Sequence, residues 1–590
     1  MNNHNQYKGP SLPLSDEMDS QKYRQKDESF HGKVVRISGA LSDNLEHEDA
    51  LVDILGEMRF LPAGRVQSSM GANKITTAYN CFVSGEIEDS MNSIMEKASE
   101  AAETMRRGGG IGYDFSYIRP RGANIKSLNS QASGPISIMG IYDAVCQTIS
   151  SSGHRRGAQM GSLRVDHPDI REFVAAKRNS DRLTGFNVSV GITDKFMQAL
   201  SAEDDSFDLV FEGQVYDTIS ARDLWDQIMS STWDWAEPGV LFIDRINEMN
   251  NLHYAETIST TNPCGEQPLP PYGACLLGSF NLVKYLYKVN SGDCCYSFNF
   301  TQFKRDIPHV VRAMDNVVDR TIYPLKEQED EARNKRRMGL GITGLANAGE
   351  MLGYRYGSPE FLGWAEKVFA CLRDNAYRAS AGLASEKGAF PLYREEFLKS
   401  NFIRTLPASV KKEIRKHGIR NSHLTSYAPT GTISLVADNV SSGIEPPFAH
   451  YYDRTIQEPN GSRVERVEDY AYSRGFPGRT ANELTVSEHL GVLALASHYV
   501  DSAVSKTCNV GDEVDYESFK EVYKQAWEDG CKGITTFRAS GKRFGILQTV
   551  EEEAEDSGEI ESSREESTTQ EGEAATACYI DPTTGQKECS

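Results

Sequence analysis

The sequence contains no apolar run long enough to cross a bilayer, and its first residues, MNNHNQYKGP, lack the apolar stretch of a signal peptide. It also has no Cys-x-x-Cys pair and no Cys/His cluster with the spacing of a zinc site. These absences predict a cytoplasmic protein that neither spans a membrane nor holds a structural metal. A chain of 590 residues, 39% hydrophobic and 25% charged, is long enough to form several domains or one large α/β barrel.

Acidic residues outnumber basic ones, and the negative charge is unevenly spread. The net charge is −21, and residues 549–576 alone contain eleven Asp and Glu against one Arg. The rest of the chain is mildly acidic, which argues against binding to nucleic acid. After Leu547 the composition shifts to Glu, Ser and Thr without aromatics, which is typical of a disordered linker. If the chain binds a nucleotide, hydrogen-bond donors within the binding site itself must hold the phosphates.

The cysteines number eleven, an odd count in a chain without a secretory signal. This favours reduced thiols with a few redox-active members over a disulfide framework.

One stretch, TNPCGEQPLPPYGACLLGSFNL at residues 261–282, concentrates chemically useful side chains. Pro263 disfavours a helical conformation at Asn262, so we expect an extended segment or loop. In an extended chain Asn262, Cys264 and Glu266 would share one face, because alternate side chains point the same way. Gly265 would let another molecule approach the backbone, and a second thiol, Cys275, follows closely.

Elsewhere the chain alternates strand-like and helix-like segments. Residues 185–190 and 239–243 read as strands, whereas residues 221–235 and 306–318 read as helices. This alternation predicts a parallel sheet with crossover helices. Short helices are also expected at about 43–58, after Ser42-Asp43, and at 90–107, whereas residues 1–30 are polar and expected to be loose.

Residues 339–344, GLGITG, match the dinucleotide fingerprint G-x-G-x-x-G. The fingerprint should follow an apolar strand, but the preceding DEARNKRR is almost wholly charged. Tight backbone packing before a helix at 345–353 is the better interpretation.

Residues 427–434, YAPTGTIS, end in an apolar run preceded by Thr and Ser. A helix capped there would present free N–H groups, which suit a phosphate.

Several of these motifs together resemble ribonucleotide reductase catalytic subunits, most closely the adenosylcobalamin-dependent class II. The resemblance extends roughly from Arg59 to Leu547 and is carried by NPCGE and ACLLGS in the stretch above, and by NCFV at 80–83, RRGGG at 106–110, HRRGA at 154–158, MGLG at 338–341 and APTGT at 428–432. Each motif is weak alone, and their order and spacing are specific.

The resemblance implies an α/β fold: a ten-stranded α/β barrel, made of two antiparallel-arranged halves of five parallel strands around a central finger loop. The implied organisation is a short N-terminal helical region at 1–75, the barrel at 76–547, an acidic linker at 548–577 and a redox tail at 578–590. Residues 1–75 are too short for the ATP-binding cone of many relatives, so we expect no overall activity switch.

The resemblance also implies residue roles. Cys264 becomes the transient thiyl radical, Glu266 is the general base, Asn262 orients the sugar hydroxyls, and Cys81 and Cys275 supply two electrons. The implied substrate-phosphate site comprises Pro429, Thr430, Gly431, Thr432, Ile433 and Ser434. Asp89, Lys126, Arg155 and Arg156 are the candidates for contacts with a deoxynucleotide or ATP specificity effector. Cys578 and Cys589 would re-reduce the cysteine pair, although their ten-residue gap is wider than usual.

The radical source separates two alternatives. Class I subunits carry a tyrosine pair near the end of the barrel, where this chain reads GITTFR at 533–538, and the pair Tyr451-Tyr452 lies elsewhere. No glycyl-radical motif is found, so adenosylcobalamin is the expected cofactor. A class I subunit awaiting a radical-generating metalloprotein remains the alternative, and a catalytically silent nucleotide sensor is the third. Expected partners are a ribonucleotide substrate and a thioredoxin- or glutaredoxin-like reductant, with a homodimer as a possible assembly.

Overall fold

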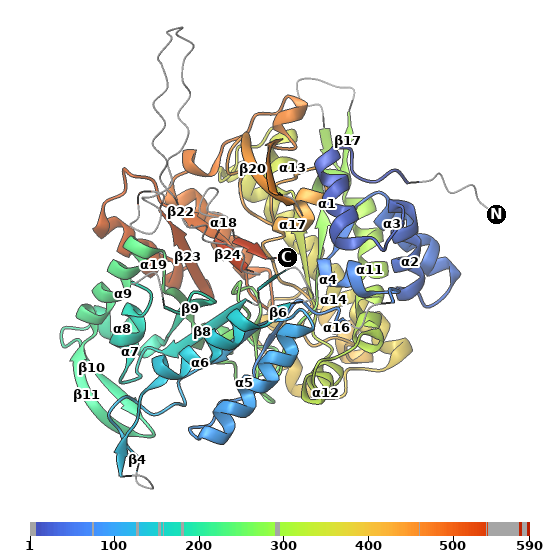
Figure 1. Ribbon diagram of the computed structural model, residues 1–590. Helices are drawn as coiled ribbons and strands as arrows, with labels where there is room; N and C mark the ends of the chain where they lie inside the picture. The colour runs from blue at the N-terminus through green and yellow to red at the C-terminus, as the bar shows by residue number, and fades with distance from the viewer. Residues whose placement is uncertain are drawn as a thin grey trace, which may run out of the picture.

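The computed structural model describes residues 7–73, 76–125, 129–151, 155–156, 158–178, 182–289, 296–458, 461–538, 540, 578–580 and 587–589 (Figure 1). The acidic linker predicted after Leu547 lies outside these residues. Among them, no helix combines the length and the apolar character needed to cross a membrane.

The N-terminal segment is not loose where it is described, so that prediction was wrong for residues 7–30. It forms α1 (Pro13–Tyr23), followed by α2 (Phe30–Leu41) and α3 (Leu45–Gly56). Leu14, Met18 and Tyr23 are buried, because α1 turns its few apolar side chains to one face. The cap of α3 is Asn44, whose side chain accepts from His47 N, and not the Ser42-Asp43 pair.

Five parallel strands form the first half of the largest sheet, as the alternating pattern predicted. They are β2 (Cys81–Val83), β3 (Gly110–Asp114), β8 (Gln159–Arg164), β9 (Phe186–Ile192) and β12 (Gly239–Phe242). Helices α5 (Met91–Arg106), α6 (Pro135–Thr148) and α9 (Ala221–Trp235) lie in the connections. The side chains of these strands are mostly buried, as expected for parallel strands covered by helices.

The second half joins this sheet in the opposite direction. Strand β12 pairs antiparallel with β23 (Gly533–Phe537), which is parallel to β22 (Thr507–Asn509). At the other edge β15 (Ala274–Cys275) pairs antiparallel with β2. A separate sheet contains β1 (Phe60–Pro62), β16 (Leu277–Asn281) and β19 (Gly339–Thr343), of which β16 and β19 are parallel.

Two isolated parallel bridges, Leu340↔Thr425 and Tyr427↔Val504, lie between β19 and the region of β22. The fold is therefore a mixed α/β architecture with a large parallel sheet, and these bridges alone do not establish a closed ten-stranded barrel. The Gly339–Thr343 segment is itself a strand, so the G-x-G-x-x-G match begins inside β19 rather than after a strand.

The remaining described elements surround these strands. The helices are α4 (Gly64–Ser69), α7 (Ile170–Ala175), α8 (Asp194–Ser201), α10 (Ile243–Glu248), α11 (Phe300–Arg320), α12 (Lys326–Lys335), α13 (Leu345–Met351), α14 (Pro359–Lys387), α15 (Asn401–Arg404), α16 (Ala408–His417), α17 (Gly431–Val436), α18 (Val486–His498) and α19 (Tyr516–Glu528), with 3-10 turns at Leu282–Tyr285, Glu395–Lys399, Tyr472–Arg474 and Ala481–Glu483. The two-stranded hairpins are β4–β5 (Asn124–Ile125, Ser130–Gln131), β6–β7 (Ser150–Ser151, Arg155–Arg156), β10–β11 (Ser206–Phe211, Gln214–Ser220), β13–β14 (Thr260–Thr261, Pro268–Leu269), β17–β18 (Leu286–Lys288, Tyr296–Phe298), β20–β21 (Tyr451–Glu458, Gly461–Glu468) and β24–β25 (Cys578–Ile580, Lys587–Cys589).

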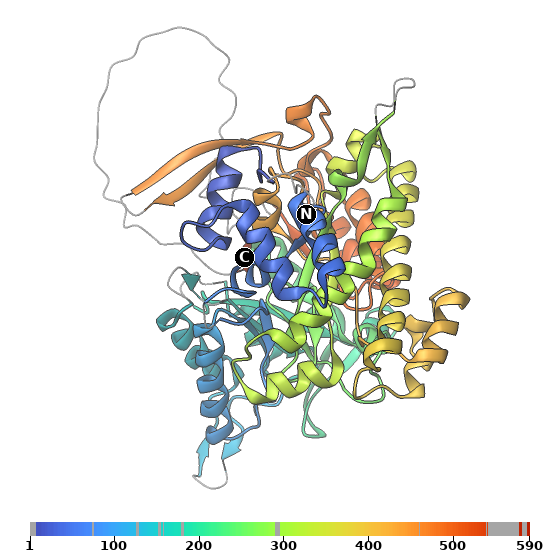
Figure 2. The same cartoon turned by 90° about the vertical axis from the view of Figure 1, so that its right-hand side faces the viewer.

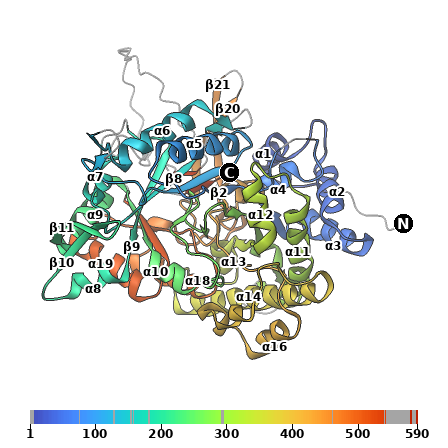
Figure 3. The same cartoon turned by 90° about the horizontal axis from the view of Figure 1, so that it is seen from below.

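Seen from below, most helices surround the central strands such as β2, β8 and β9, whereas the hairpins β10–β11 and β20–β21 lie at the edge of the molecule (Figure 3). One apolar core lies over the first half of the sheet. A second core joins helices α11 and α14 to the N-terminal helices, since Leu14, Val34 and Leu55 belong to it. Figure 2 shows α1 beneath the β20–β21 hairpin and beside α17. The N-terminal helices are therefore packed into the body of the protein.

The β13–β14 hairpin lies against β3 at a point where only glycine fits. A Cβ atom on Gly112 would lie 1.9 Å from the backbone oxygen of Thr261. The hairpin can pack this closely on β3 because Gly112 has no side chain.

We predict that Gly112→Ala displaces the β13–β14 hairpin. The added methyl meets backbone and not a flexible side chain, so about 1–3 kcal/mol of stability should be lost. The thermal unfolding midpoint should fall. The matched control is Gly363→Ala on the exposed face of α14, where a Cβ meets nothing within 4 Å; that change should be neutral or stabilising. Equal effects of the two substitutions would contradict this packing.

A buried polar cluster behind α17 joins α13 to the segment after the β20–β21 hairpin. Asn347 Nδ2 donates to both oxygens of Asp469, at 3.0 and 2.9 Å, and its Oδ1 accepts from Ser441 N at 2.6 Å. The carboxyl of Glu350 lies beside this pair. Burial, and then the charge of Asp469, raise the pKa of Glu350 to about 8. Glu350 therefore stays protonated at neutral pH.

We predict that this cluster makes stability depend on pH. An unfolded glutamate loses its proton near pH 4.5, whereas Glu350 keeps it to about pH 8, so the folded state binds more protons in that window. Stability should fall as the pH rises from about 4.5 to about 8. Glu350→Gln should flatten the dependence in thermal denaturation between pH 5 and pH 9, and an unchanged slope in the variant would refute the assignment.

Candidate active site

The residues predicted to carry the chemistry lie at the tip of the β13–β14 hairpin. Asn262 N donates to Gln267 O at 3.0 Å, and Gln267 N donates to Asn262 Oδ1 at 2.9 Å. Gly265 has a φ of +84° and reverses the chain between them. Of the two conformations expected, an extended segment or a loop, the structure has the loop: residues 262–267 form a closed turn, because Asn262 pairs with Gln267.

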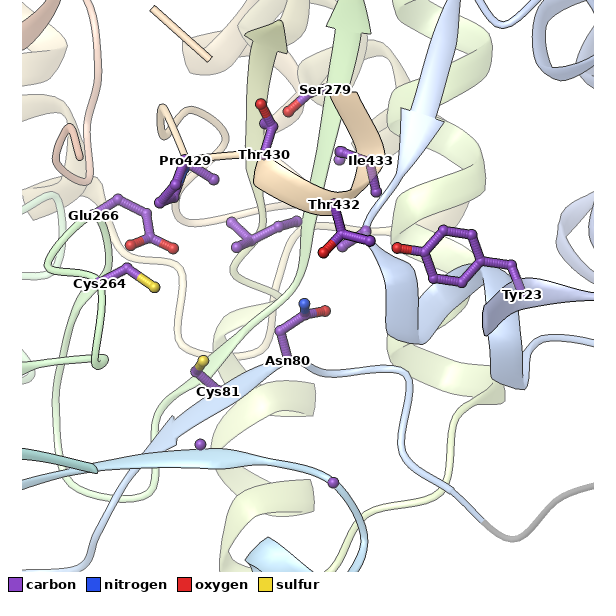
Figure 4. A pocket seen from close by; sticks show the side chains of 16 residues that line it. Tyr23, Asn80, Cys81, Cys264, Glu266, Ser279, Pro429, Thr430, Thr432 and Ile433 are labelled. Atoms are coloured by element: carbon purple, nitrogen blue, oxygen red, sulfur yellow. The ribbon is translucent and has the colours of Figure 1, made fainter. Parts of the chain in front are cut away.

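A cavity with about 640 Å³ of empty space opens beside this turn. Its lining consists of Tyr23, Ala63, Asn80, Cys81, Gly108, Gly110, Cys264, Glu266, Leu277, Gly278, Ser279, Ala428, Pro429, Thr430, Thr432 and Ile433. Figure 4 shows Cys264 and Glu266 side by side on one wall, with Cys81 entering from below. The turn, β2 and the 428–433 segment, distant in sequence, thus face one space.

Asn262 does not line this cavity. Its side chain is fully buried, and its Oδ1 holds the turn closed through Gln267 N. Its Nδ2 is buried without a hydrogen-bond partner. An unpaired buried N–H is costly, so this donor lacks a partner that would stabilise it.

Cys81 and Cys275 are directly opposite one another in the antiparallel β2–β15 pair. Residues opposed in this way have Cα atoms about 4.5–5.5 Å apart, within the range of a disulfide. Both are free thiols. Burial, followed by the charges of Cys81 and Glu266, raises the pKa of the Cys275 thiol well above its usual value. Cys275 therefore stays protonated behind Cys81.

Cys264 is disulfide-bonded, and its partner is none of the free cysteines Cys81, Cys146, Cys275, Cys371, Cys508 and Cys531. Any chemistry that needs the Cys264 thiol therefore requires the reduced form.

The two tail cysteines lie in the β24–β25 hairpin. Cys578 and Cys589 are directly opposite in its register, so the wide gap in sequence closes in space. Strand β25 packs against α17, which borders the cavity. The backbone of the tail thus reaches the site.

The predicted phosphate segment contributes four of its six residues to the cavity, namely Pro429, Thr430, Thr432 and Ile433. Thr430 precedes α17 with a φ of +60° and does not cap the helix, contrary to expectation. Its hydroxyl instead accepts from Gly443 N at 2.6 Å and bonds Thr343 Oγ1 at 2.9 Å. Gly431 and Ser434 do not line the cavity; Ser434 Oγ lies 2.9 Å from Ser442 Oγ. These bonds fix the shape of the segment.

Of the four effector candidates, the structure describes the side chain of Asp89 alone. Asp89 pairs with Arg119, whose guanidinium and backbone N–H both donate to its carboxylate. Arg155 and Arg156 form β7, of which only the backbone is described, and Lys126 lies outside the described residues.

A second cavity of about 480 Å³ also reaches Cys264 and shares no other lining residue with the first. Its walls come from β12, the 503–506 segment and residues 533–535 of β23. The walls combine apolar side chains with hydroxyls from Ser189, Ser497, Ser505 and Thr535. Cys264 is therefore accessible from two spaces.

Two buried lysines line this second cavity. Lys506 Nζ donates to Glu445 Oε2 at 2.7 Å. Lys532 Nζ donates to the carbonyls of Val500, Asp501 and Ser502, and burial lowers its pKa to about 8. Both amino groups are thus tied to the protein.

Sequence reasoning missed several lining residues. Asn80 adjoins a predicted cysteine and could have been found. Tyr23, Ser279, Lys506 and Lys532 carry no local motif, and only the fold brings them to the cavities. Within the described part of the chain, no group of three or more His, Cys, Asp or Glu could hold a metal ion.

Comparison with known proteins identifies the family. The family model described as "Ribonucleotide reductase, barrel domain" matches residues 79–474 and 476–537. A vitamin B12-dependent ribonucleoside-diphosphate reductase of Thermoplasma acidophilum is 34% identical over 528 residues, covering 84% of this chain and 65% of the relative. One of Mycobacterium tuberculosis is 35% identical, covering 84% and 72%. A ribonucleoside-diphosphate reductase subunit alpha of Chlamydia muridarum is 25% identical, covering 83% and 54%.

The chain thus spans about two thirds of the length of the first two relatives. The family match covers most of the chain, including Cys81, Cys264, Cys275 and the cavity walls from Asn80 onward. The chain therefore belongs to the ribonucleotide reductase family and carries its barrel domain.

Proposed function

We propose that this protein reduces ribonucleotides to 2′-deoxyribonucleotides by thiyl-radical chemistry and depends on adenosylcobalamin. The observation that carries the proposal is a single cavity that Cys264, Glu266 and Cys81 all line, with Cys275 opposite Cys81 in the sheet. Hydrogen abstraction, proton removal and two-electron reduction need these groups around one sugar. The relatives of Thermoplasma acidophilum and Mycobacterium tuberculosis act on diphosphates by name, so we propose ribonucleoside diphosphates as substrates.

The ribose of the substrate lies against the hairpin tip in this proposal. The Cys264 thiyl takes the hydrogen from C3′, and Glu266 accepts the proton of the 3′-hydroxyl as general base. The Asn262 Nδ2 donor is oriented for a sugar hydroxyl by the bond that fixes its Oδ1. Loss of the 2′-hydroxyl as water is feasible next to a C3′ radical, although hydroxide alone is a poor leaving group.

Cys81 and Cys275 supply the two electrons. Each thiol gives up one hydrogen, the substrate gains hydrogen in place of the 2′-hydroxyl, and water leaves as the pair becomes a disulfide. Cys264 recovers its hydrogen from the substrate at the end of each cycle. Because Cys275 is buried and protonated, it delivers hydrogen rather than acting as an exposed thiolate.

The β24–β25 tail would reset the pair by thiol–disulfide exchange and would then be reduced by a thioredoxin- or glutaredoxin-like protein. Its position against α17 and the opposition of Cys578 and Cys589 support this role. The proposed function also assigns the parts of the chain: residues 1–75 precede the catalytic domain at 76–547, and residues 548–577 are the tether of the tail. We further propose that the two isolated bridges complete a closed ten-stranded barrel.

The phosphates of the substrate would lie along Pro429–Ser434, of which four residues line the cavity. Asp89, Lys126, Arg155 and Arg156 remain the candidates for contacts with a specificity effector, and a homodimer is a possible assembly.

The residues around the second cavity fit the adenosyl group of an adenosylcobalamin cofactor. The cavity reaches Cys264, and its wall at 533–535 is Gly-Ile-Thr, where a class I chain would need tyrosines. Met160, Val240 and Ile534 offer apolar surface to an adenine ring, and Ser189 and Ser505 offer hydroxyls to a ribose. When bound, the cofactor supplies the radical that Cys264 carries. Lys506 and Lys532 hold the walls of this cavity in place.

We predict that the purified chain converts a ribonucleoside diphosphate to its deoxy product when given adenosylcobalamin and dithiothreitol. Cys264→Ser should lower turnover by about a thousandfold or more, because the serine O–H bond is too strong to replace the thiol. Product formation is measured by chromatography. Cys371→Ser, at a free cysteine remote from both cavities, is the control and should stay active.

The reading as a class I subunit predicts a different result. Activity would then appear only after addition of a second, radical-generating metalloprotein, and adenosylcobalamin would have no effect. That outcome would falsify the cofactor assignment. The same assay with a ribonucleoside triphosphate tests the choice of substrate.

We predict that filling the second cavity blocks the cofactor and spares the substrate. Thr535→Phe adds a ring to the wall of this cavity, so the Kd for adenosylcobalamin should rise about tenfold or more. Thr535→Val, which keeps the side-chain volume, should change it little. Cofactor affinity is followed by cobalamin absorbance and nucleotide affinity by calorimetry. Unchanged cofactor affinity in Thr535→Phe would place the cofactor elsewhere.

A further inference from the structure

The first cavity contains an aromatic hydroxyl that comes from outside the matched barrel domain. Tyr23 is the last residue of α1, is 4% exposed and lines the cavity. In Figure 4 its ring projects from one side with the hydroxyl toward Thr432, at the end away from Cys264 and Glu266. We propose that Tyr23 is a substrate-binding residue whose hydroxyl donates a hydrogen bond to the diphosphate. This inference rests on the proposed function.

The charges of the cavity place the diphosphate at the Tyr23 end. Glu266 is the one acidic residue among those that line the cavity, and the lining includes no Lys, Arg or His. An anionic diphosphate avoids Glu266 by Coulomb repulsion, whereas the ribose must approach Cys264 and Glu266 to react. The phosphates are thus directed to the opposite end, where the Tyr23 hydroxyl points toward the Thr432 side chain.

The described lining therefore offers the anion neutral donors. The Thr430 hydroxyl bonds Gly443 N and Thr343, whereas Tyr23 and Thr432 bring hydroxyl groups to the lining at that end. A bond from a hydroxyl to a charged phosphate oxygen is stronger than a neutral one. Two cations lie next to lining residues without lining the cavity themselves. Lys33 Nζ lies 5.9 Å from the centre of the Tyr23 ring and pairs with Asp19. The Arg65 guanidinium borders Gly108, since a Cβ atom there would lie 2.5 Å from Arg65 Cζ.

The protein holds Tyr23 in a defined position. A Cβ atom on Gly64 would lie 2.9 Å from Tyr23 Cε1 and 3.0 Å from its hydroxyl, so the ring packs on bare backbone. Helix α1 is fastened to the phosphate segment, because Ser15 Oγ donates to Leu435 O at 2.6 Å. Asp438 also accepts from Ser11 N and Leu12 N, at 2.6 and 3.0 Å. The Tyr23 hydroxyl is therefore held at a fixed position relative to α17.

The test compares Tyr23→Phe with wild type in the full chain with adenosylcobalamin and dithiothreitol. The phenyl ring preserves the packing on Gly64 and removes only the hydroxyl. KM for the diphosphate should rise about tenfold, with kcat within about twofold. Tyr7→Phe is the matched control: Tyr7 also belongs to the N-terminal segment, and its hydroxyl bonds Asp53 away from the cavity.

Inorganic pyrophosphate distinguishes a phosphate contact from a base contact. Its inhibition constant should rise in Tyr23→Phe by about the same factor as KM, for substrates with any base. An unchanged KM, a fall in kcat alone, or a KM effect confined to one base with unchanged pyrophosphate inhibition would overturn the proposal. If wild type proves inactive, the proposed function fails, and equilibrium binding of pyrophosphate to the two proteins still tests Tyr23.

Gly64→Ala tests the same contact in a second way, because the added methyl displaces the Tyr23 ring. It should weaken pyrophosphate binding in the same direction. Normal pyrophosphate binding by both variants would exclude the hydroxyl as a ligand.

Discussion

The close contact between the Thr261 carbonyl and Gly112 is the constraint on which the site depends. The β13–β14 hairpin can enter the interior only because β3 has no side chain at that point. The contact places the hairpin tip beside β2 and β3, so that Cys264 and Glu266 share a cavity with Cys81. A Cβ on Gly110 would likewise lie 3.3 Å from both Cys81 Sγ and Pro263 Cγ. Glycines in β3 thus set the distance between the hairpin tip and the cysteine pair.

The chemistry also depends on how charge is excluded from the two cavities. The first cavity has one carboxylate and no cation in its lining, so an anionic substrate must be held by backbone and hydroxyl donors away from Glu266. The second cavity is lined by two lysines, and both amino groups are occupied by protein acceptors. Because both lysines are bonded to the protein, few unpaired donors are left beside a radical at Cys264.

The residues that we propose as catalytic could be selected from sequence because their motifs are local. Asn262, Cys264 and Glu266 lie within five residues, and the alternation of strands and helices indicated the parallel sheet that the structure contains. The conformation of the turn could not be predicted, since the pairing of Asn262 with Gln267 depends on the β13–β14 ladder. Thr430 illustrates the same limit: its hydroxyl bonds Thr343 and Gly443 N instead of capping α17.

The N-terminal segment was mispredicted for a related reason. Residues 7–30 are polar on average, and only docking on α4 and α17 makes the buried face of α1 stable. Tyr23 reaches the cavity through that docking, and the second cavity arises where several distant segments meet.

The central claim is that Cys81 and Cys275 are the reductant that faces Cys264. Its most direct test is one turnover by pre-reduced enzyme without external dithiol, in a chain carrying Cys578→Ser and Cys589→Ser to prevent exchange with the tail. Disulfides are then mapped by mass spectrometry, and deoxynucleotide is counted per chain. The structure predicts about one deoxynucleotide for each new Cys81–Cys275 disulfide. Product formed with Cys81 and Cys275 still reduced, or with a disulfide between other cysteines such as Cys508 and Cys531, would contradict it.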